Sequence, residues 1–335
     1  MARSRVMQRM RRGLSLIGPV LCCLGFFFCW QPAASVRAAT VYDLSGLHWR
    51  SIGPAVAGGR VAAVAGTNAN DSLYFVGTAG GGVYRTRDGG ATWDDVFAKQ
   101  PEASIGALAI APSNPNVVWV GTGESKPRND IALGSGVWRS QDGGTTWQRR
   151  GLADTALIAR ILVDPHRSNT VLVGALGDPY KDSTARGVYR SVDGGASWHQ
   201  TLYAGPASGV SDLAWAAQSA RLVFAGVWQF RRRPWTFTSG GTADGLYRSR
   251  DGGITWRKLR GNGLPSGPMG RIGIAIAPSD ARRVYALIQS KAGALWRSDD
   301  GGDHWRLMSA DTLINQRPFY MSRLEVDPRD ENHVF

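Results

Sequence analysis

A short sequence box recurs five times along this chain and limits its fold more than any other feature. Each copy runs from an Arg through Ser or Thr, Asp and two adjacent glycines to a Trp, and the first spans Arg85–Trp93. Successive boxes lie 49 to 58 residues apart, which is a spacing typical of repeat architectures. The Asp and Trp residues of the five boxes are Asp88 and Trp93, Asp142 and Trp147, Asp193 and Trp198, Asp251 and Trp256, and Asp300 and Trp305.

Each repeat predicts four short β-strands. A pair of apolar residues such as Val83-Tyr84 precedes each box, and further upstream two apolar segments flank a polar turn. Ala107–Gly121 is the clearest copy of this upstream element, which returns at Ile161–Gly174, Ile274–Leu287 and Leu324–Phe335. A four-stranded unit repeated radially is the blade of a β-propeller, so we predict an all-β propeller.

The box residues themselves are expected to be structural. The Asp, and the Ser or Thr two residues before it, are suited to bond backbone amides and close a tight turn, while the glycines allow positive φ. The Trp begins the outermost strand and is expected to pack between neighbouring blades. A catalytic or calcium-binding role is disfavoured, because a turn is needed in every blade and a catalytic residue only once.

The motif S-x-D-x-G-x-T-W is the Asp-box, or BNR repeat. The chain resembles secreted bacterial Asp-box propellers that are grouped with the N-terminal domain of sortilin (VPS10), many of which carry the name glycosyl hydrolase. Sialidases, xyloglucan-cleaving endoglucanases and a photosystem assembly factor share the motif. The resemblance implies a propeller fold and leaves the function open, because one fold hosts many functions.

The repeats predict five complete blades and the beginning of a sixth. Leu47–Ile52 resembles an outermost strand such as Thr255–Leu259 and is expected to complete the last blade. Because Asp-box propellers close with more than five blades, we expect the chain to be truncated at its C-terminus. The predicted blades span about 46–97, 104–150, 158–202, 209–260 and 270–308, with a partial blade at 320–335.

Residues 1–38 are predicted to be a secretory signal peptide. Six arginines and no acidic residue precede residue 39, Leu14–Trp30 is an apolar run, and Val36–Ala38 fits cleavage after Ala38. A membrane anchor is the alternative, because the run approaches the ~20 residues that span a bilayer. Arg11-Arg12 is compatible with twin-arginine export as well as general secretion. We expect a secreted or periplasmic protein without a stable anchor after cleavage.

Charge and cysteine content argue against several classes of function. The net charge is +13, but without the six leader arginines it is +7, spread over an exported chain, so we expect no nucleic-acid partner. Cys22, Cys23 and Cys29 all lie in the leader, which leaves the body without a disulfide, a Cys-ligated metal or a thiol nucleophile. We predict no metal site and no cofactor.

Functional residues are expected in loops opposite the Asp-boxes, because loops on a rigid scaffold carry binding and catalysis. Three of these loops are insertions, at Glu124–Ser135, Gly177–Arg186 and Gln229–Asp244. Glycoside hydrolysis usually needs two carboxyl groups. The catalytic candidates are Glu124 together with Asp130, Asp178 or Asp182.

A set of arginines is expected to face the central channel. Arg60, Arg160, Arg271 and Arg323 each stand near the start of an innermost strand. They are suited either to bind carboxylates or phosphates as a cationic ring, or to pair with acids and carbonyls of neighbouring blades. The remaining ligand-binding candidates, for which a solvated basic loop is the alternative at 231–235, are Arg128, Tyr180, Arg186, Arg231, Arg232, Arg233 and Trp235.

The resemblance to xyloglucan-cleaving enzymes implies a catalytic Asp in a T-D-I-G-G-A-Y-R segment of the first blade. Thr78–Arg85 is the matching run, and Ala79 stands at the carboxylate position. Arg271-Ile272-Gly273 lacks the proline of the sialidase Arg-Ile-Pro element. We therefore predict an exported module that binds a protein or glycan ligand, with a glycoside hydrolase whose carboxylate pair includes Glu124 as the alternative.

Overall fold

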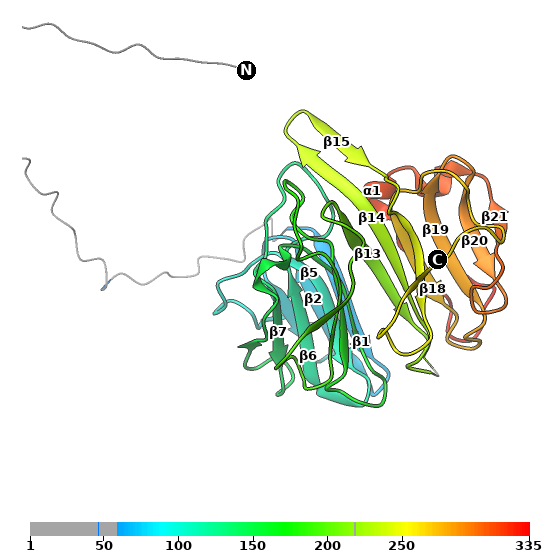
Figure 1. The fold of residues 1–335 in the computed structure, drawn as a ribbon. Helices are drawn as coiled ribbons and strands as arrows, with labels where there is room; N and C mark the ends of the chain where they lie inside the picture. Colours follow the sequence, from blue (N-terminus) through cyan, green and yellow to red (C-terminus); the bar gives the residue numbers. More distant parts are fainter. Residues whose placement is uncertain (1–45, 47–58, 218) are drawn as a thin grey trace, which may run out of the picture. The chain divides into compact units, whose positions relative to one another are not determined.

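The computed structural model describes residue 46, residues 59–217 and residues 219–335 (Figure 1). By internal contacts the chain divides into two units, Met1–Ile52 and Gly53–Phe335, and the following concerns the second. The predicted signal peptide and the predicted Leu47–Ile52 strand lie outside the described residues. In the part of the chain that is described, no helix is long and apolar enough to cross a membrane.

The described residues of the second unit form five antiparallel sheets, each built from four strands in chain order. Sheet 1 contains β1 (Val61–Thr67), β2 (Asn70–Thr78), β3 (Val83–Thr86) and β4 (Asp94–Asp95). Sheet 2 contains β5 (Ile105–Ala111), β6 (Asn114–Thr122), β7 (Val137–Ser140) and β8 (Gln148–Arg149). Sheet 3 contains β9 (Ile158–Val163), β10 (Val171–Ala175), β11 (Gly187–Ser191) and β12 (His199–Leu202).

Sheets 4 and 5 repeat the same order. Sheet 4 contains β13 (Ser208–Trp215), β14 (Val223–Arg233), β16 (Gly245–Ser249) and β17 (Arg257–Lys258), with β15 (Thr236–Ser239) paired to the end of β14. Sheet 5 contains β18 (Ile272–Ile276), β19 (Val284–Ser290), β20 (Gly293–Ser298) and β21 (Arg306–Ser309). The short helices are η1 (Ala153–Thr155), η2 (Thr312–Asn315) and α1 (Pro318–Met321). The all-β class and the four-stranded units predicted from the repeats are confirmed.

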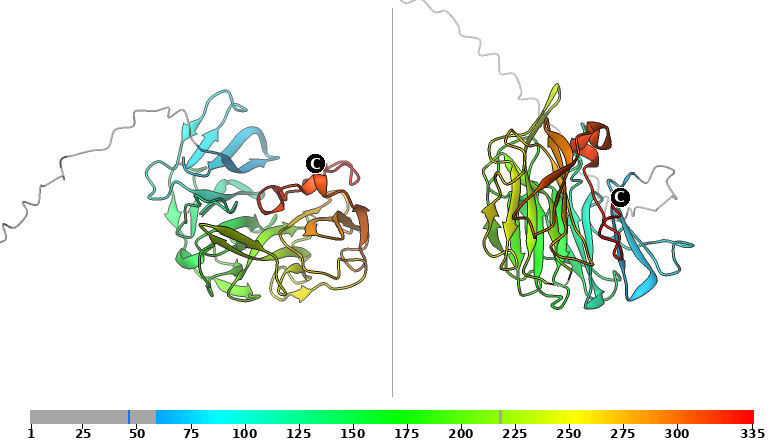
Figure 2. Two further views of the ribbon diagram at one scale, coloured as in Figure 1. Left: turned by 90° about the horizontal axis from the view of Figure 1, so that it is seen from above. Right: turned by 90° about the vertical axis from the view of Figure 1, so that its right-hand side faces the viewer.

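Neighbouring sheets contact one another through their first strands. β1 contacts β5, β5 contacts β9, β9 contacts β13 and β13 contacts β18, and the succession of colours in Figure 2 follows this order. The core is divided among the spaces between successive sheets. Phe75, Ile105 and Trp147 belong to the cluster between sheets 1 and 2.

A glycine in the second strand of each of the first four sheets makes room for the next sheet. At Gly121, an added Cβ would lie 2.5 Å from the Ile158 Cγ2 of sheet 3. The corresponding contacts are Gly77 with Ile105, Gly174 with Val210 and Gly226 with Ile272. In sheet 5 the same register position, opposite Leu295, is Leu287, and no further four-stranded sheet follows in the described residues.

The Asp-boxes form the turns that the sequence indicates. In sheet 2 the Ser140 hydroxyl donates to Asp142 Oδ1 (2.7 Å) and accepts from the Gly144 amide (2.8 Å). Asp142 also accepts hydrogen bonds from the amide (2.8 Å) and the hydroxyl (2.6 Å) of Thr146. In sheet 1 the hydroxyl and the amide of Thr92 make the same contacts with Asp88 and hold the pKa of that carboxyl well below its usual range.

The box tryptophan connects one sheet to the sheet before it. Trp147 Nε1 donates to the Val96 carbonyl of sheet 1 (2.9 Å), and its ring packs edge-on against Phe97 with centroids 5.3 Å apart. Trp198 Nε1 donates in the same way to Arg150 O (2.6 Å). Trp93, in the first sheet, bonds to Gly90 O within its own turn (3.1 Å). It is 43% exposed, whereas Trp147 is 9% exposed.

Two segments differ from the expected structure. The Gln229–Asp244 insertion is not a simple loop, because β14 extends to Arg233. The last four residues of β14, Phe230–Arg233, pair with the four residues of β15. This hairpin reverses at Pro234-Trp235, where proline fits a turn and interrupts the ladder. Leu324–Phe335 forms one isolated bridge, between Val326 and Val334, rather than two strands.

The glycine contacts predict a steric effect on stability. Gly121→Ala should lower the free energy of unfolding by about 1–3 kcal/mol, because the new methyl overlaps Ile158 in a packed interface. Gly80→Ala is the matched control, since no heavy atom lies within 4 Å of its added Cβ, and it should change stability by less than about 0.5 kcal/mol. Urea unfolding measures both, and equal effects would refute the intersheet explanation.

The tryptophan contacts predict a difference between two copies of one motif. Trp147→Ala should destabilise the fold by about 3 kcal/mol, because it removes a buried ring together with the hydrogen bond to Val96. Trp93→Ala removes the same side chain from an exposed position and should cost less than about 1 kcal/mol. Thermal unfolding of the two variants measures this difference. Equal losses of stability would mean that the tryptophan acts only within its own turn and does not connect sheets.

Candidate functional site

The four catalytic candidates separate into two groups by their contacts. Glu124 and Asp130 both lie in the insertion after β6, and both interact electrostatically with Arg60 at the start of β1. Asp178 and Asp182 lie in the insertion after β10 and line a surface cleft of about 630 Å³ together with Lys181. Asp182 forms an ion pair with Arg231 of β14, and Asp178 Oδ2 lies 3.8 Å from Lys181 Nζ.

Glu124 is buried and held from two sides. Its carboxylate accepts two hydrogen bonds from the Arg60 guanidinium, one of them from Nε (3.3 Å) and the other from Nη2. Its backbone amide donates to the Ser104 hydroxyl (3.0 Å). Asp130 is exposed, and its Oδ1 lies 3.5 Å from Arg128 Nε. The insertion after β6 therefore supplies one carboxylate fixed by an ion pair and one that is open to solvent.

Three of the four arginines that were predicted to face a channel make contacts with other sheets or segments. Arg60 pairs with Glu124 of sheet 2, and Arg160 Nε lies 3.6 Å from Asp212 of sheet 4. Arg271 Nη1 donates to the carbonyls of Ser125 (3.2 Å) and Phe319 (2.6 Å).

Repulsion between like charges links Arg160, Arg271 and Arg323. Burial, and next the charge of Arg323, lowers the pKa of Arg271 to about 10. Arg323 keeps an exposed surface, yet the surrounding protein atoms lower its pKa by desolvation, followed by the charge of Arg160. Arg160 and Arg271 therefore bind groups of other sheets or segments, and together with Arg323 they bring several positive charges close together.

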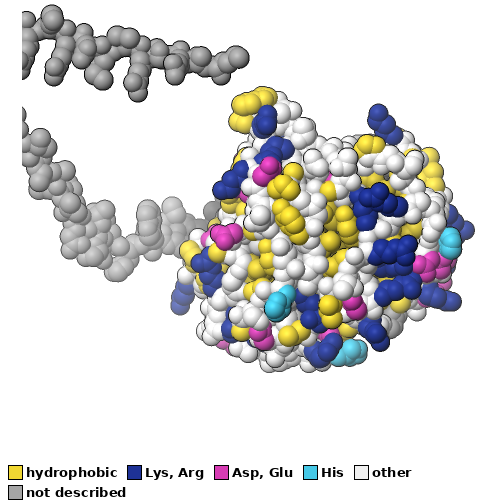
Figure 3. Space-filling model, in the orientation of Figure 1, with side chains coloured by type: hydrophobic (Ala, Val, Ile, Leu, Met, Phe, Trp, Pro, Cys, Tyr) yellow, Lys and Arg dark blue, Asp and Glu magenta, His cyan; other side chains and the backbone are white. Residues whose placement is uncertain are grey.

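The β14–β15 hairpin presents the other basic candidates. Trp235 at its tip is 78% exposed, and apolar and basic side chains stand together at this tip in Figure 3. The guanidinium of Arg232 lies 5.3 Å from the centroid of the Phe237 ring. Arg233 is exposed at the end of β14, and Tyr180 is exposed in the neighbouring insertion. These side chains are free to contact a ligand.

Arg186, one of the predicted ligand contacts, is buried inside its own insertion. Its side chain is fully buried, and the guanidinium donates to the carbonyls of Leu176 (2.8 Å), Asp178 and Lys181 (3.1 Å). Burial, and next the charge of Arg231, lowers its pKa to about 10. Arg186 holds the backbone of its own insertion in place, and a sequence gives no sign of which arginine of a loop turns inward.

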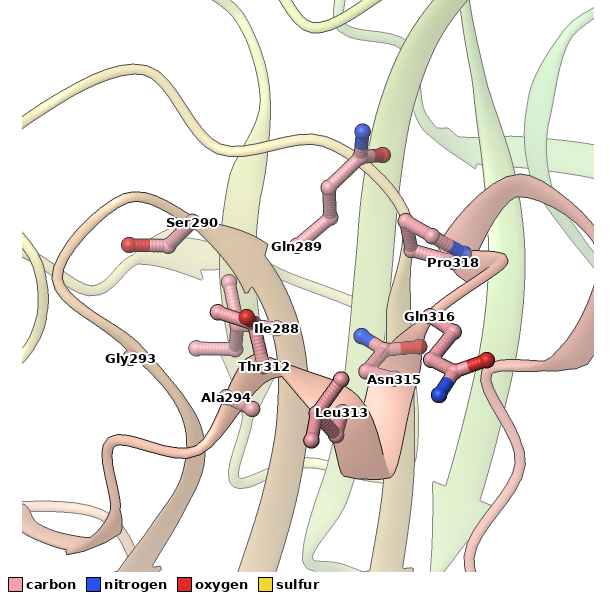
Figure 4. A pocket seen from close by; sticks show the side chains of 10 residues that line it. All are labelled: Ile288, Gln289, Ser290, Gly293, Ala294, Thr312, Leu313, Asn315, Gln316 and Pro318. Carbon is pink, nitrogen blue, oxygen red and sulfur yellow. The ribbon is translucent and has the colours of Figure 1, made fainter.

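A second cleft has a volume of about 380 Å³ (Figure 4). It lies between the β19–β20 turn and the segment that carries η2, and neutral polar side chains including Gln289, Asn315 and Gln316 line it. Gln289 Oε1 accepts a hydrogen bond from the backbone amide of Arg271 (3.2 Å), which connects the cleft to the backbone of that residue. In the described ranges, no group of three His, Cys, Asp or Glu side chains is placed to hold a metal ion.

The motifs do not reveal two residues of this region. Asp212 binds Arg160 and also accepts from the Ile274 amide (2.9 Å). The Tyr320 ring lies beneath Lys126 Nζ (5.4 Å) and the Arg128 guanidinium (5.9 Å). Asp212 follows an irregularity in the pairing of β13, and Tyr320 lies in a segment without a recurring pattern, so neither had a recognisable signal.

Asp244 closes the hairpin insertion as a buried carboxyl. It accepts hydrogen bonds from the amides of Gln229 (2.6 Å) and Gly241 (2.9 Å). Burial raises its pKa to about 8, and these bonds oppose that shift only in part.

Comparisons with known proteins place this geometry among Asp-box proteins. Residues 247–258 match the BNR/Asp-box repeat family. A xyloglucanase of Paenibacillus sp is 28% identical over 252 residues, which cover 74% of this chain and 21% of that enzyme. A xyloglucanase of Acetivibrio thermocellus is 25% identical over 213 residues, or 57% of this chain and 24% of that enzyme. This chain thus spans about a quarter or less of the length of these curated relatives.

The fold has a related solved structure. The crystal structure of the GH74 xyloglucanase from Xanthomonas campestris superposes with a TM-score of 0.60 at 21% identity, covering 82% of this chain and 43% of that one. The resemblance to Asp-box propellers is confirmed. The grouping with sortilin stays a prediction.

The buried carboxyl predicts a pH dependence of stability. Because burial raises the pKa of Asp244 from its ordinary value of 3.8 to about 8, the folded state binds the proton more tightly. Its contribution to stability is complete below pH 4 and is lost as the pH rises to 8, with a slope of at most about 1.4 kcal/mol per pH unit. Asp244→Asn should remove this slope in urea unfolding at pH 5 to 8. The exposed control Asp71→Asn should keep it, and a slope unchanged in Asp244→Asn would contradict the assignment.

Proposed function

We propose that this chain is part of a glycan-cleaving β-propeller, a glycoside hydrolase rather than a simple binding module. The similarity to xyloglucanases over 74% of the chain is the observation that carries this proposal. The five sheets are then five blades of the propeller, and residues 320–335 begin a sixth. Residues 1–38 would direct the protein to the periplasm or the medium, where polysaccharides are accessible.

The proposed reaction uses Glu124 and Asp130. A pair of carboxyl groups on either side of a glycosidic bond protonates the leaving oxygen and either attacks the sugar or activates water. Arg60 compensates the charge of Glu124 and fixes its orientation, which suits the role of nucleophile or base. Asp130 is exposed on the same insertion and is the candidate for the acid.

The position of Ala79 supports the choice of Glu124. Ala79 stands where the xyloglucan-cleaving segment has its Asp, so this chain has no carboxylate there. The Ala79 amide donates to the Arg60 carbonyl (2.9 Å), and the Arg60 side chain binds Glu124. The Glu124 carboxylate therefore enters the same neighbourhood from sheet 2.

A binding module is the second candidate, because Ala79 removes the carboxylate that the related motif supplies. Such a module would use the same face to hold a glycan without cleaving it. Hydrolysis and binding, measured on the same preparation, distinguish the two functions.

The hydrolase proposal predicts a specific loss of activity. Glu124→Gln should reduce the release of reducing ends from xyloglucan and other β-glucans by at least about 10²-fold. It should lower the melting temperature, because the ion pair with Arg60 is lost, but the amide keeps one acceptor for Arg60 and the variant is expected to fold, which circular dichroism checks. Glu102→Gln, on a half-buried glutamate outside this site, is the control and should retain full activity.

Two results would count against this proposal. A Glu124→Gln variant with the wild-type rate would remove Glu124 from the mechanism. A folded wild-type chain that binds these glycans and releases no reducing ends would favour the binding module.

A further inference from the structure

Cationic side chains from five segments meet where the first strands begin. We call Arg60, Lys126, Arg160, Arg271 and Arg323 the cationic cluster. Repulsion between like charges connects Lys126 with Arg323, Arg271 and Arg60, Arg271 with Arg323, and Arg323 with Arg160. The contacts between these segments agree. Arg60 binds Glu124, the carbonyl of Ser125 beside Lys126 accepts from Arg271 Nη1 (3.2 Å), and a Cβ added at Gly273 would lie 3.4 Å from the Arg323 Cα. Asp212 binds both Arg160 and the Ile274 amide of sheet 5 (2.9 Å).

Acidic groups neutralise only part of the cluster. Glu124 pairs with Arg60, and Asp212 pairs with Arg160. Among the described residues, no ion pair involves Lys126, Arg271 or Arg323, and the nearby Asp130 is paired with Arg128. The charges of Asp212 and Glu325 also act on Arg323, and that of Asp212 acts on Arg271. The cluster therefore keeps an excess of positive charge that these carboxylates offset only in part.

Arg271 is the costliest member of the cluster. It is 4% exposed, its guanidinium lies 5.3 Å from the centroid of the Trp228 ring, and its Nε has no hydrogen-bond partner in the described structure. Burying a charge without a full set of partners is unfavourable. A bound anion would supply the missing countercharge, and the exposed Arg323 keeps the cluster accessible from solvent.

The surroundings of the cluster are suited to a sugar. The Tyr320 ring, held by Lys126 and Arg128, is partly exposed and offers an aromatic face. The cleft of Figure 4 is lined by apolar side chains such as Ile288 and Leu313 together with the amides of Asn315 and Gln316. Amides are neutral donors and acceptors that match hydroxyl groups. An anion subsite thus adjoins a groove lined by both apolar and neutral polar side chains.

We propose that the cationic cluster binds the carboxylate of a uronic acid unit, so that the ligand is an acidic glycan rather than a neutral one. The carboxylate accepts paired hydrogen bonds from guanidinium groups, which arginine provides in a fixed planar geometry. The neutral part of the sugar chain lies along the cleft between β19 and η2. That the ligand is a glycan rests on the proposed function, whereas the carboxylate subsite rests on the charges described above.

Calorimetric titration of the full chain with trigalacturonate and with its methyl ester tests this proposal. The acid should bind at least about 10-fold more tightly than the ester, because only the acid forms charge-assisted hydrogen bonds. Arg323→Ala should weaken the acid about 10-fold and leave the ester unchanged. Arg329→Ala, an exposed arginine outside the cluster, is the matched control and should bind like the wild type. Because Arg323 is exposed, its variant is expected to fold, and circular dichroism checks this.

Equal affinity for the acid and the ester, or an Arg323→Ala variant that binds like the wild type, would overturn the proposal. Binding of an acetylated dipeptide with a free C-terminus, without binding of trigalacturonate, would overturn it in favour of a peptide ligand. These equilibria are separate from the hydrolysis assay. Cleavage of neutral xyloglucan by a chain that does not bind trigalacturonate would reject the acidic ligand and retain the hydrolase. Binding of trigalacturonate without cleavage of any glycan would retain the acidic ligand and reject the hydrolase.

Discussion

Neighbouring sheets of this protein are held together where a β-branched side chain of one sheet enters the space left by a glycine of the sheet before it. Ile158 enters at Gly121, and Ile272 enters at Gly226. These side chains stand at the beginning of the first strands, so the contact brings successive strand beginnings close together. Arg271 directly precedes Ile272, and Arg160 follows Ile158 by two residues. The packing that joins the sheets therefore also gathers the arginines.

The positive charges at the beginning of the first strands contribute both to cohesion between sheets and to the proposed binding of an anion. Glu124 and Asp212 bind two of the arginines across sheet boundaries, so part of the charge serves cohesion. The remainder, centred on Arg271 and Arg323, forms no ion pair among the described residues and is offset only in part by Asp212 and Glu325, so it costs stability. Proteins keep such costs where function requires them. A carboxylate on a sugar provides the compensation and agrees with a relationship to glycan-cleaving enzymes.

The repeated parts of the fold could be predicted from the sequence, and the inward turns of single side chains could not. The five Asp-boxes predict the sheets because each box fixes a local turn through contacts within a few residues. Arg186 shows the limit, since its position in a polar insertion suggests a ligand contact and its guanidinium instead bonds carbonyls of that insertion. Glu124 was a predictable candidate, whereas Asp212 and Tyr320 depend on which strands and segments meet in space.

The most direct test is a crystal structure of the full chain with trigalacturonate. A carboxylate of the sugar is predicted at roughly 3 Å from the guanidinium group of the exposed Arg323, with the rest of the oligosaccharide along the cleft that Gln289 lines. A sugar bound only in the Asp178–Asp182 cleft, or with its carboxylates directed to solvent, would contradict the account.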